Sequence, residues 1–242
     1  MTLDTQRKIE SHSLQSKFLN EERNIKVFVP PNYDPAVPLP IVYCHDGLEF
    51  FTHGRVATIA NQLMLDGEIP PFLIAGIAVN LNKRRDDYAL DGARHGAYQR
   101  FVIEECLPML DGLYNVDDHQ RLMAGISLGA VASLGFMLAY PQYFHTLILF
   151  SGAYFPDVQA YIRETSELSR LYAYMVVGDE ETQAKTPSGG VFNFYQYNED
   201  MRDILFDKGA QVEYRVGHGN HIWGFWQKEL PDALRWLGKN IK

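Results

Sequence analysis

The feature that most constrains the fold is an alternation of two kinds of segment along the chain. Short, largely apolar runs, typical of strands covered on both faces, predict strands at Ile25–Val29, Pro40–Cys44, Phe72–Val79, Arg121–Ile126, Thr146–Phe150, Leu171–Val177 and Gln211–Val216. Helix-like segments fall between them, at Arg55–Leu65, Gly96–Tyr114, Leu128–Ala139, Asp157–Leu168, Phe192–Asp207 and Trp223–Lys239. This alternation predicts an α/β protein with a mostly parallel central sheet and helices on both faces.

No linker divides the chain. It has 242 residues, no internal repeat and no low-complexity block, so we expect one domain spanning residues 1–242. In parallel sheets of this kind, ligands bind at the carboxyl ends of the strands. Residues that follow the predicted strands are therefore the first candidates for chemistry.

The charge balance argues against two classes of partner. The chain holds 22 Lys and Arg against 30 Asp and Glu, a formal net charge of −8, and no basic run. Such a chain is a poor candidate to bind nucleic acid or an anionic membrane surface. No window approaches the roughly 18 consecutive apolar residues of a transmembrane helix. The N-terminal residues do not have the pattern of a signal peptide, so we expect a cytoplasmic protein.

The two cysteines, Cys44 and Cys106, lie in apolar contexts without the spacing of a zinc site or a disulfide framework. We interpret them as buried thiols in a reducing compartment. Calcium-loop and phosphate-loop motifs are absent, so no metal and no cofactor are expected. The expected partner is a small-molecule substrate, and the sequence leaves association of identical chains open.

A candidate nucleophile follows one predicted strand. Gly125-Ile126-Ser127-Leu128-Gly129 has the G-x-S-x-G pattern of a nucleophile elbow, between a strand and the apolar helix at Leu128–Ala139. Gly125 and Gly129 leave room where a Cβ would collide with the elbow or the following helix. The alternative is that Ser127 simply caps that helix.

A serine nucleophile needs a base and an acid that orients the base. In an α/β-hydrolase the base follows the last strand, where His218 and His221 both fit. The acid is expected in the loop after Leu171–Val177, which contains Asp179, Glu180 and Glu181. Position and spacing alone choose neither the histidine nor the carboxylate.

Two other features near the expected site have two interpretations each. His45 precedes Asp46-Gly47 near the expected oxyanion hole, and we interpret it as structural. The run Lys83-Arg84-Arg85 could hold an anionic group of a substrate, or form ion pairs with the adjacent Asp86-Asp87.

The aromatic residues near the C-terminus are expected to act mainly in packing. Asn193–Tyr197 is more often helix packing than a substrate platform. Trp223 and Trp226 are expected to pack the last helix against the sheet, and Trp223 is close enough to His221 in sequence to line a pocket.

Several motifs in order resemble the putative esterase family of the α/β-hydrolase superfamily, which includes enterochelin-type siderophore esterases, feruloyl esterases, S-formylglutathione hydrolases and mycolyltransferases. The resemblance covers nearly the whole chain. It rests on the elbow together with Ile25–Tyr33 (V-x-V-x-x-P-x-x-Y), Tyr43–Phe51 (Y-x-x-D-G-x-x-x-F), Phe101–Pro108 (F-x-x-E-E-L-x-P, with Cys106 for Leu) and Gly219–Trp226 (G-G-H-x-W-x-x-W, with Asn220 for the second Gly).

The resemblance implies an α/β-hydrolase fold and a catalytic triad. It places the nucleophile at Ser127, the base at His221, two residues before the first tryptophan of its motif, and the acid at Glu181. Many relatives carry Asp at the acid position, and Asp179 is the alternative here.

The resemblance also implies an oxyanion hole made by the backbone N–H groups of Leu48 and Leu128. The N–H that follows the nucleophile lies at a helix N-terminus, where partial positive charge meets the developing oxyanion. The expected function is hydrolysis of carboxylic esters by a serine esterase. Alternatives are a siderophore trilactone esterase, a thioester hydrolase of the S-formylglutathione type, an acyltransferase and a catalytically silent binding scaffold.

Overall fold

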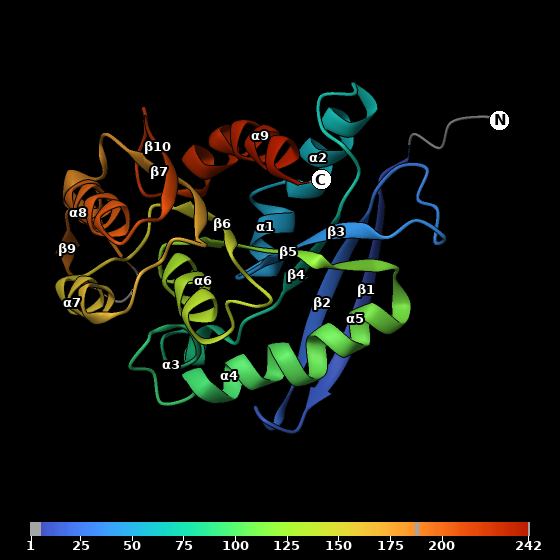
Figure 1. Ribbon diagram of the computed structural model, residues 1–242, viewed down its shortest axis with the longest axis horizontal. Helices are drawn as coiled ribbons and strands as arrows, with labels where there is room; N and C mark the ends of the chain where they lie inside the picture. The colour runs from blue at the N-terminus through green and yellow to red at the C-terminus, as the bar shows by residue number, and fades with distance from the viewer. Residues whose placement is uncertain (1–5, 187–188, 242) are drawn as a thin grey trace.

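An eight-stranded sheet forms the centre of the computed structural model, which describes residues 6–186 and 189–241 (Figure 1). The strand order is β1-β2-β4-β3-β5-β6-β7-β10. The strands are β1 (Lys8–Ser16), β2 (Glu21–Val29), β3 (Leu39–Cys44), β4 (Leu73–Ile77), β5 (Val116–Ile126), β6 (Thr146–Phe150), β7 (Tyr172–Gly178) and β10 (Gln211–Gly217). The pairs from β4 to β10 are parallel, whereas β1–β2 and β2–β4 are antiparallel.

Helices cover both faces of the sheet (Figure 1). One face carries α1 (Gly47–Thr52), α2 (Val56–Leu65) and α9 (Trp223–Asn240). The other carries α3 (Arg84–Tyr88), α4 (His95–Phe101), the π-helical η2 (Val102–Cys106), α5 (Leu107–Leu113), α6 (Leu128–Ala139), α7 (Pro156–Glu164) and α8 (Phe194–Asp207). The predicted α/β class is thereby confirmed. None of the described helices is long and apolar enough to cross a membrane.

The central elements form where local sequence is least ambiguous. All five residues of β4 are buried, and β6 and α6 begin and end where the apolar runs predict. Two buried clusters, one on each face, explain why these strands are apolar on both sides.

Differences from the predicted elements lie mainly at the edges. The polar strand β1 was not predicted, because it alternates exposed and partly buried residues at the edge of the sheet. The predicted helix at Gly96–Tyr114 is divided by η2. Phe192 lies in the small hairpin of β8 (Ala184–Lys185) and β9 (Val191–Phe192) instead of in a helix, and the short α1 and α3 were not predicted.

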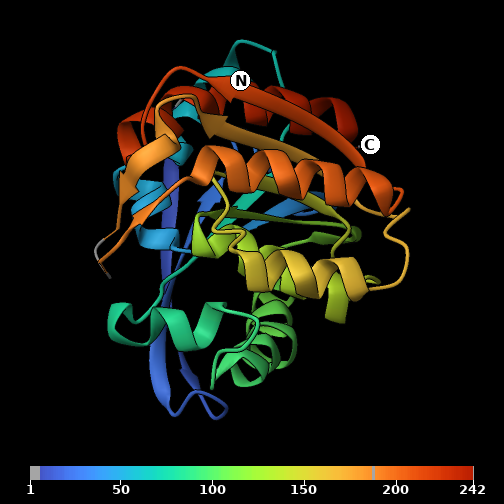
Figure 2. The same ribbon diagram turned by 90° about the vertical axis from the view of Figure 1, so that its left-hand side faces the viewer.

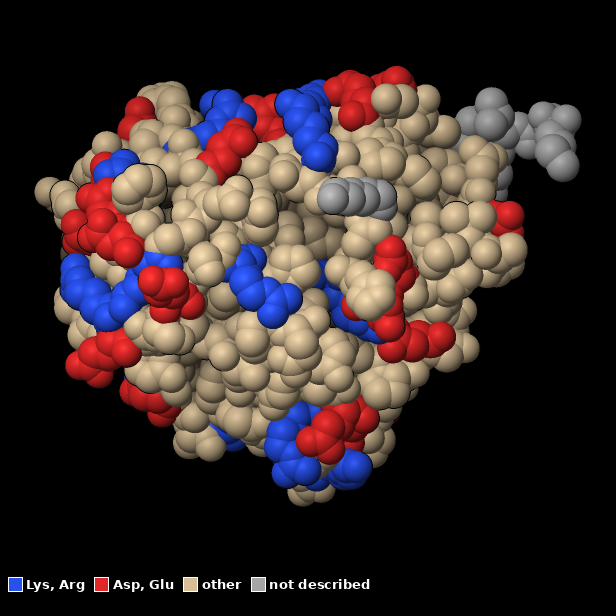
Figure 3. Space-filling view, viewed as in Figure 1, with Lys and Arg blue, Asp and Glu red and all other residues tan. Residues whose placement is uncertain are grey.

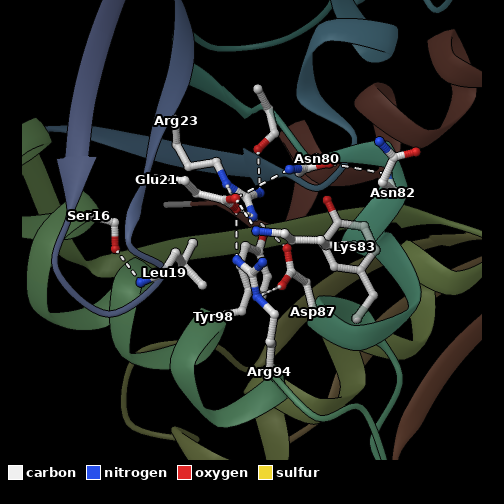
Figure 4. A network of polar contacts seen from close by, with 12 residues as sticks. Ser16, Leu19, Glu21, Arg23, Asn80, Asn82, Lys83, Asp87, Arg94 and Tyr98 are labelled. Atoms are coloured by element: carbon white, nitrogen blue, oxygen red, sulfur yellow. Dashed lines mark hydrogen bonds and ion pairs between the residues drawn. The ribbon is translucent and has the colours of Figure 1, made fainter.

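A partly buried network of charges ties α3 to β2 (Figure 4). Arg23 of β2 donates to Asp87 of α3 and to Glu21, both at 2.5 Å. Arg94 contacts the same two carboxylates at 3.0 and 2.7 Å, and Lys83 donates to Glu21 at 2.9 Å. Asp87 is fully buried, so its carboxylate depends on these cations. The network fixes the short helix that contributes two side chains to the site described below.

On the face of the molecule shown in Figure 3, acidic and basic side chains are interspersed among large neutral areas. The turned view in Figure 2 shows the β8–β9 hairpin beyond the carboxyl ends of the parallel strands, on the same side as α3.

Candidate active site

Ser127 lies at the sharp turn between β5 and α6, with φ 56° and ψ −116°. A Cβ on Gly125 would lie 2.1 Å from the carbonyl oxygen of Gly129, so the predicted steric need for glycine holds there. A Cβ on Gly129 would lie 3.2 Å from atoms of His45 and Asp46. The second glycine therefore allows the elbow to approach the loop after β3. Among the described contacts the Ser127 side chain makes no helix-capping hydrogen bond, so the capping interpretation is wrong.

Three of the candidate residues meet at the carboxyl ends of β5, β7 and β10. His221 Nε2 lies 3.1 Å from Ser127 Oγ, and His221 Nδ1 lies 2.6 Å from Glu181 Oε2. Glu181 comes from the 3-10 turn η3 (Glu181–Gln183) after β7, and His221 from the loop between β10 and α9. With Nδ1 donating to the carboxylate, Nε2 is available to accept the serine proton.

Glu181 is fully buried, and both of its oxygens have donors. Oε1 accepts hydrogen bonds from Ser151 Oγ at 2.6 Å and from the Gly178 N–H at 2.8 Å. Ser151 Oγ in turn accepts from Trp226 Nε1 at 2.8 Å. Ser151 has φ 44° and directly follows β6. A chain of hydrogen bonds thus runs from Trp226 through Ser151 and Glu181 to His221.

Aromatic rings hold the imidazole of His221 in place. Phe194 stacks on it with ring centroids 3.9 Å apart and planes 19° apart. The ring of Trp226 lies perpendicular to it, at an interplanar angle of 88° and a centroid distance of 4.9 Å. Phe194 is fully buried, so the expected packing role includes contact with the imidazole. Both contacts restrict rotation of the ring about its side-chain bonds.

A cavity of about 1160 Å³ opens beside Ser127 and His221. It is larger than the usual range of small-molecule pockets, roughly 300–1,000 Å³. Apolar side chains dominate its wall, among them Leu81, Leu90, Val131, Phe155, Phe192 and Trp223. Across the described residues, no group of three or more His, Cys, Asp or Glu is arranged to hold a metal ion.

A model of the family described as "Putative esterase" matches residues 16–237. This chain belongs to that family. The family is one of carboxylic ester hydrolases, and the resemblance found from the motifs is confirmed.

Two curated relatives are similar to this esterase over most of its length. The uncharacterized protein YjcH of Bacillus subtilis is 29% identical over 230 residues, which are 94% of this chain and 96% of that protein. An iron(III) enterobactin esterase of Dickeya dadantii is 24% identical, over 92% of this chain and 53% of that protein.

Solved structures share the fold. A ferulic acid esterase superposes with a TM-score of 0.83 at 20% identity, covering 98% of this chain and 99% of that one. An enterobactin esterase from Shigella flexneri superposes with a TM-score of 0.82 at 18% identity, covering 96% of this chain and 59% of that one.

The other candidates for the base and the acid lie farther from Ser127. His218, with 75% of its side chain exposed, has Nδ1 at 3.2 Å from both carboxylate oxygens of Asp179. That hydrogen bond lowers the pKa of Asp179. Glu180 accepts from the side-chain amide of Asn220 at 2.5 Å. The structure therefore brings His221 and Glu181 to Ser127, and leaves His218, Asp179 and Glu180 at the surface.

The two residues proposed for the oxyanion hole each lie in the first turn of a helix. Leu128 is the first residue of α6 and Leu48 the second of α1. N–H groups in a first helical turn have no intrahelical acceptor and carry partial positive charge. A Cβ on Gly47 would lie 2.0 Å from the carbonyl carbon of Gly76, so only glycine lets α1 approach β4 this closely.

Arg84 supports the loop that precedes α1. Its guanidinium donates to both oxygens of Asp46 at 2.6 Å, and one nitrogen lies 3.4 Å from the carbonyl oxygen of Ile126. The Asp46 N–H donates to Tyr88 Oη at 2.9 Å. Both contacts come from α3, so the network beneath that helix helps to position the loop.

The basic run forms ion pairs, but not with the adjacent Asp86 and Asp87 that one interpretation named. Lys83 pairs with Glu21 and Arg85 with Asp91, both at 2.9 Å. These partners, like that of Arg84, are not the two aspartates that follow the run in sequence.

His45 is structural in this arrangement. It is buried, and its Nδ1 lies 2.8 Å from Tyr98 Oη. Burial, with a smaller effect of Arg84, lowers the pKa of His45 to about 3, so the ring is neutral at physiological pH.

Sequence reasoning missed Ser151 and the direct contact between Phe194 and His221. The signal available for Ser151 was its place directly after the strand next to the one that carries the nucleophile. No sequence signal distinguishes Phe194 from the other aromatic residues of α8, which are Tyr195, Tyr197 and Phe206.

Proposed function

We propose that this esterase acts through an acyl-enzyme on Ser127. His221 Nε2 takes the proton of Ser127 as Oγ attacks the ester carbonyl, and then gives it to the leaving alcohol. Water, deprotonated by the same nitrogen, attacks the acyl-enzyme and releases the acid and the serine. The Leu48 and Leu128 N–H groups stabilise the two tetrahedral intermediates.

The observation that supports this mechanism best is the pair of hydrogen-bond contacts that joins Ser127 through His221 to the buried Glu181. Glu181 orients His221 and stabilises the imidazolium that forms in each step. The donors on its other oxygen, Ser151 and Gly178, hold the carboxylate in position.

Replacement of the nucleophile tests the mechanism. Ser127→Ala should lower turnover of p-nitrophenyl acetate by about a million-fold, as in comparable triads, without unfolding the chain. Ser13→Ala, at an exposed position on β1, is the matched control and should keep full activity. Turnover within a few-fold of wild type in folded Ser127→Ala would refute the assignment.

A fluorophosphonate probe separates catalysis from mere binding. The probe should label Ser127 in the wild-type chain, as mapped by mass spectrometry, and should not label His221→Ala. An unlabelled wild type would favour a catalytically silent scaffold. Product analysis with an added alcohol distinguishes transfer of the acyl group from hydrolysis.

A second candidate, cleavage of a siderophore trilactone, is favoured by the size of the cavity and by the similarity to enterobactin esterases. A bulky cyclic ester would use a cavity of this volume better than a short-chain ester. We expect kcat/KM for a catecholate trilactone to exceed that for S-formylglutathione and for p-nitrophenyl acetate. A preference for S-formylglutathione would instead support the thioester hydrolase.

A further inference from the structure

Glu49 places a carboxyl group in the wall of the active-site cavity. It is the third residue of α1 and is partly buried. Its Oε2 atom is buried and has no hydrogen-bond partner among the described residues. A buried polar atom without a partner is costly, and rotation of the carboxyl group in the cavity wall would present it to a ligand as an acceptor.

The charged groups around Glu49 do not pair with it. Arg84 also lines the cavity, but its Nε and Nη2 atoms both donate to Asp46. His53 faces it from the end of α1, and the His53 ring stacks on Trp223 with centroids 5.8 Å apart. Burial, and then the charge of Asp46, raises the pKa of Glu49.

The position of Glu49 indicates which part of a substrate would reach it. It follows Leu48, whose N–H belongs to the proposed oxyanion hole, and consecutive Cα atoms are about 3.8 Å apart. The same cavity contains Ser127 and His221. A substrate group that meets Oε2 is therefore close in the molecule to the ester carbonyl.

We propose that Glu49 forms a specificity subsite that accepts a hydrogen bond from a hydroxyl or ammonium group next to the scissile ester. The inference rests on the proposed function and adds a substrate class to it. An ester with a methyl group at that position leaves Oε2 buried and unpaired. A site that holds a buried polar atom discriminates strongly against analogues that lack the matching group.

Matched esters of nearly equal size test the subsite. Ethyl lactate, alanine ethyl ester and ethyl isobutyrate carry a hydroxyl, an ammonium and a methyl group on the same carbon, and 2-hydroxyethyl acetate matches propyl acetate on the alcohol side. Hydrolysis is followed by pH-stat titration with the wild-type chain, Glu49→Leu and Glu49→Gln. Glu22→Gln, at an exposed position on β2, is the control variant.

For each ester, kcat/KM of the wild type is divided by kcat/KM of Glu49→Leu, and in this ratio the intrinsic reactivity of the ester cancels. For at least one donor-bearing ester this ratio should exceed that of its methyl isostere by on the order of tenfold or more. Glu49→Gln keeps an acceptor but loses the charge, so it should retain selectivity for a hydroxyl and lose selectivity for an ammonium. Glu22→Gln should match the wild type, and thermal melts check that each variant is folded.

Two failures are distinguishable. If the esters are hydrolysed with dependence on Ser127 but the ratio differs by less than about twofold within every matched set, Glu49 makes no selective contact and this inference alone is overturned. If the wild-type chain hydrolyses none of these esters and the fluorophosphonate leaves Ser127 unlabelled, the proposed function fails and the subsite fails with it.

Discussion

Replacement of Glu181 by glutamine should reverse the proton positions on His221. In the wild-type chain, Oε1 accepts from Ser151 and from the Gly178 N–H, while Oε2 accepts from His221 Nδ1. A glutamine amide fits the same space, but only its oxygen can face the Gly178 N–H, which cannot rotate. The NH₂ group must then point at His221 and donate to Nδ1. The proton moves to Nε2, which can no longer accept the proton of Ser127.

The size of the effect follows from this change of tautomer. In a known triad, the equivalent replacement of the acid by its amide lowered kcat by about ten-thousand-fold, or ~5 kcal/mol. Here both oxygens of the carboxylate are held by donors and its side chain is fully buried. A water molecule therefore cannot replace the amide as the partner of His221 Nδ1. We expect Glu181→Gln to fall in that range, with KM changed much less than kcat.

The assay is steady-state hydrolysis of p-nitrophenyl acetate by Glu181→Gln, Glu180→Gln and Asp179→Asn. The two controls change exposed carboxylates of the same loop and should stay within a few-fold of wild type, because solvent screens their charge. Refutation would be a loss below about tenfold in Glu181→Gln. A large loss in Asp179→Asn would move the acid to that residue and leave the reaction class unchanged.

Three further predictions test other parts of the site. His221→Ala should abolish turnover and His218→Ala should not; the opposite result in the same assay would place the base at the exposed histidine. Ser151→Ala should lower kcat about tenfold, because Glu181 loses one donor and a buried indole N–H loses its acceptor, and unchanged kinetics would exclude a positioning role. The pKa of His45 in the folded chain lies below the ordinary 6.5, so protonation of this histidine favours the unfolded chain. Its contribution to the free energy of unfolding is therefore complete above pH 6.5 and is lost as the pH falls toward 3. Between pH 7.5 and 5 this histidine should lower the free energy of unfolding by about 2 kcal/mol. Chemical denaturation at the two pH values should measure a smaller decrease in His45→Gln than in the wild-type chain.

The elements that could be predicted from the sequence are those that depend on residues adjacent in the chain. The apolar runs of β4 and β6, the apolar helix α6 and the elbow at Ser127 each depend on residues adjacent in the chain. The structure places these elements where the pattern indicates. The polar edge strand β1 depends instead on its partner β2, with which it pairs along its whole length. Its own residues provide no apolar run by which it could be recognised.

Support for the site depends on contacts between distant segments. The Asp46–Arg84 pair joins residues 38 positions apart, and the bond from Trp226 to Ser151 joins residues 75 apart. Many acidic and basic residues in the chain could form such pairs on the basis of charge alone. Only the packing of α3 and α9 against the sheet determines which of them meet, so no local pattern predicts them.

The choice between the two histidines shows the limit most clearly. The loops after β7 and β10 carry two histidine–carboxylate pairs of nearly equal separation, Asp179 with His218 at 39 residues and Glu181 with His221 at 40. Spacing cannot distinguish them. The difference is burial, because the side chains of the first pair are 47% and 75% exposed and those of the second 0% and 9%. A water-excluded pair can maintain a directed hydrogen bond and stabilise an imidazolium, whereas an exposed pair is screened. The buried pair is also the one that reaches Ser127, so the same tertiary packing that selects the residues gives them the environment that the proposed chemistry requires.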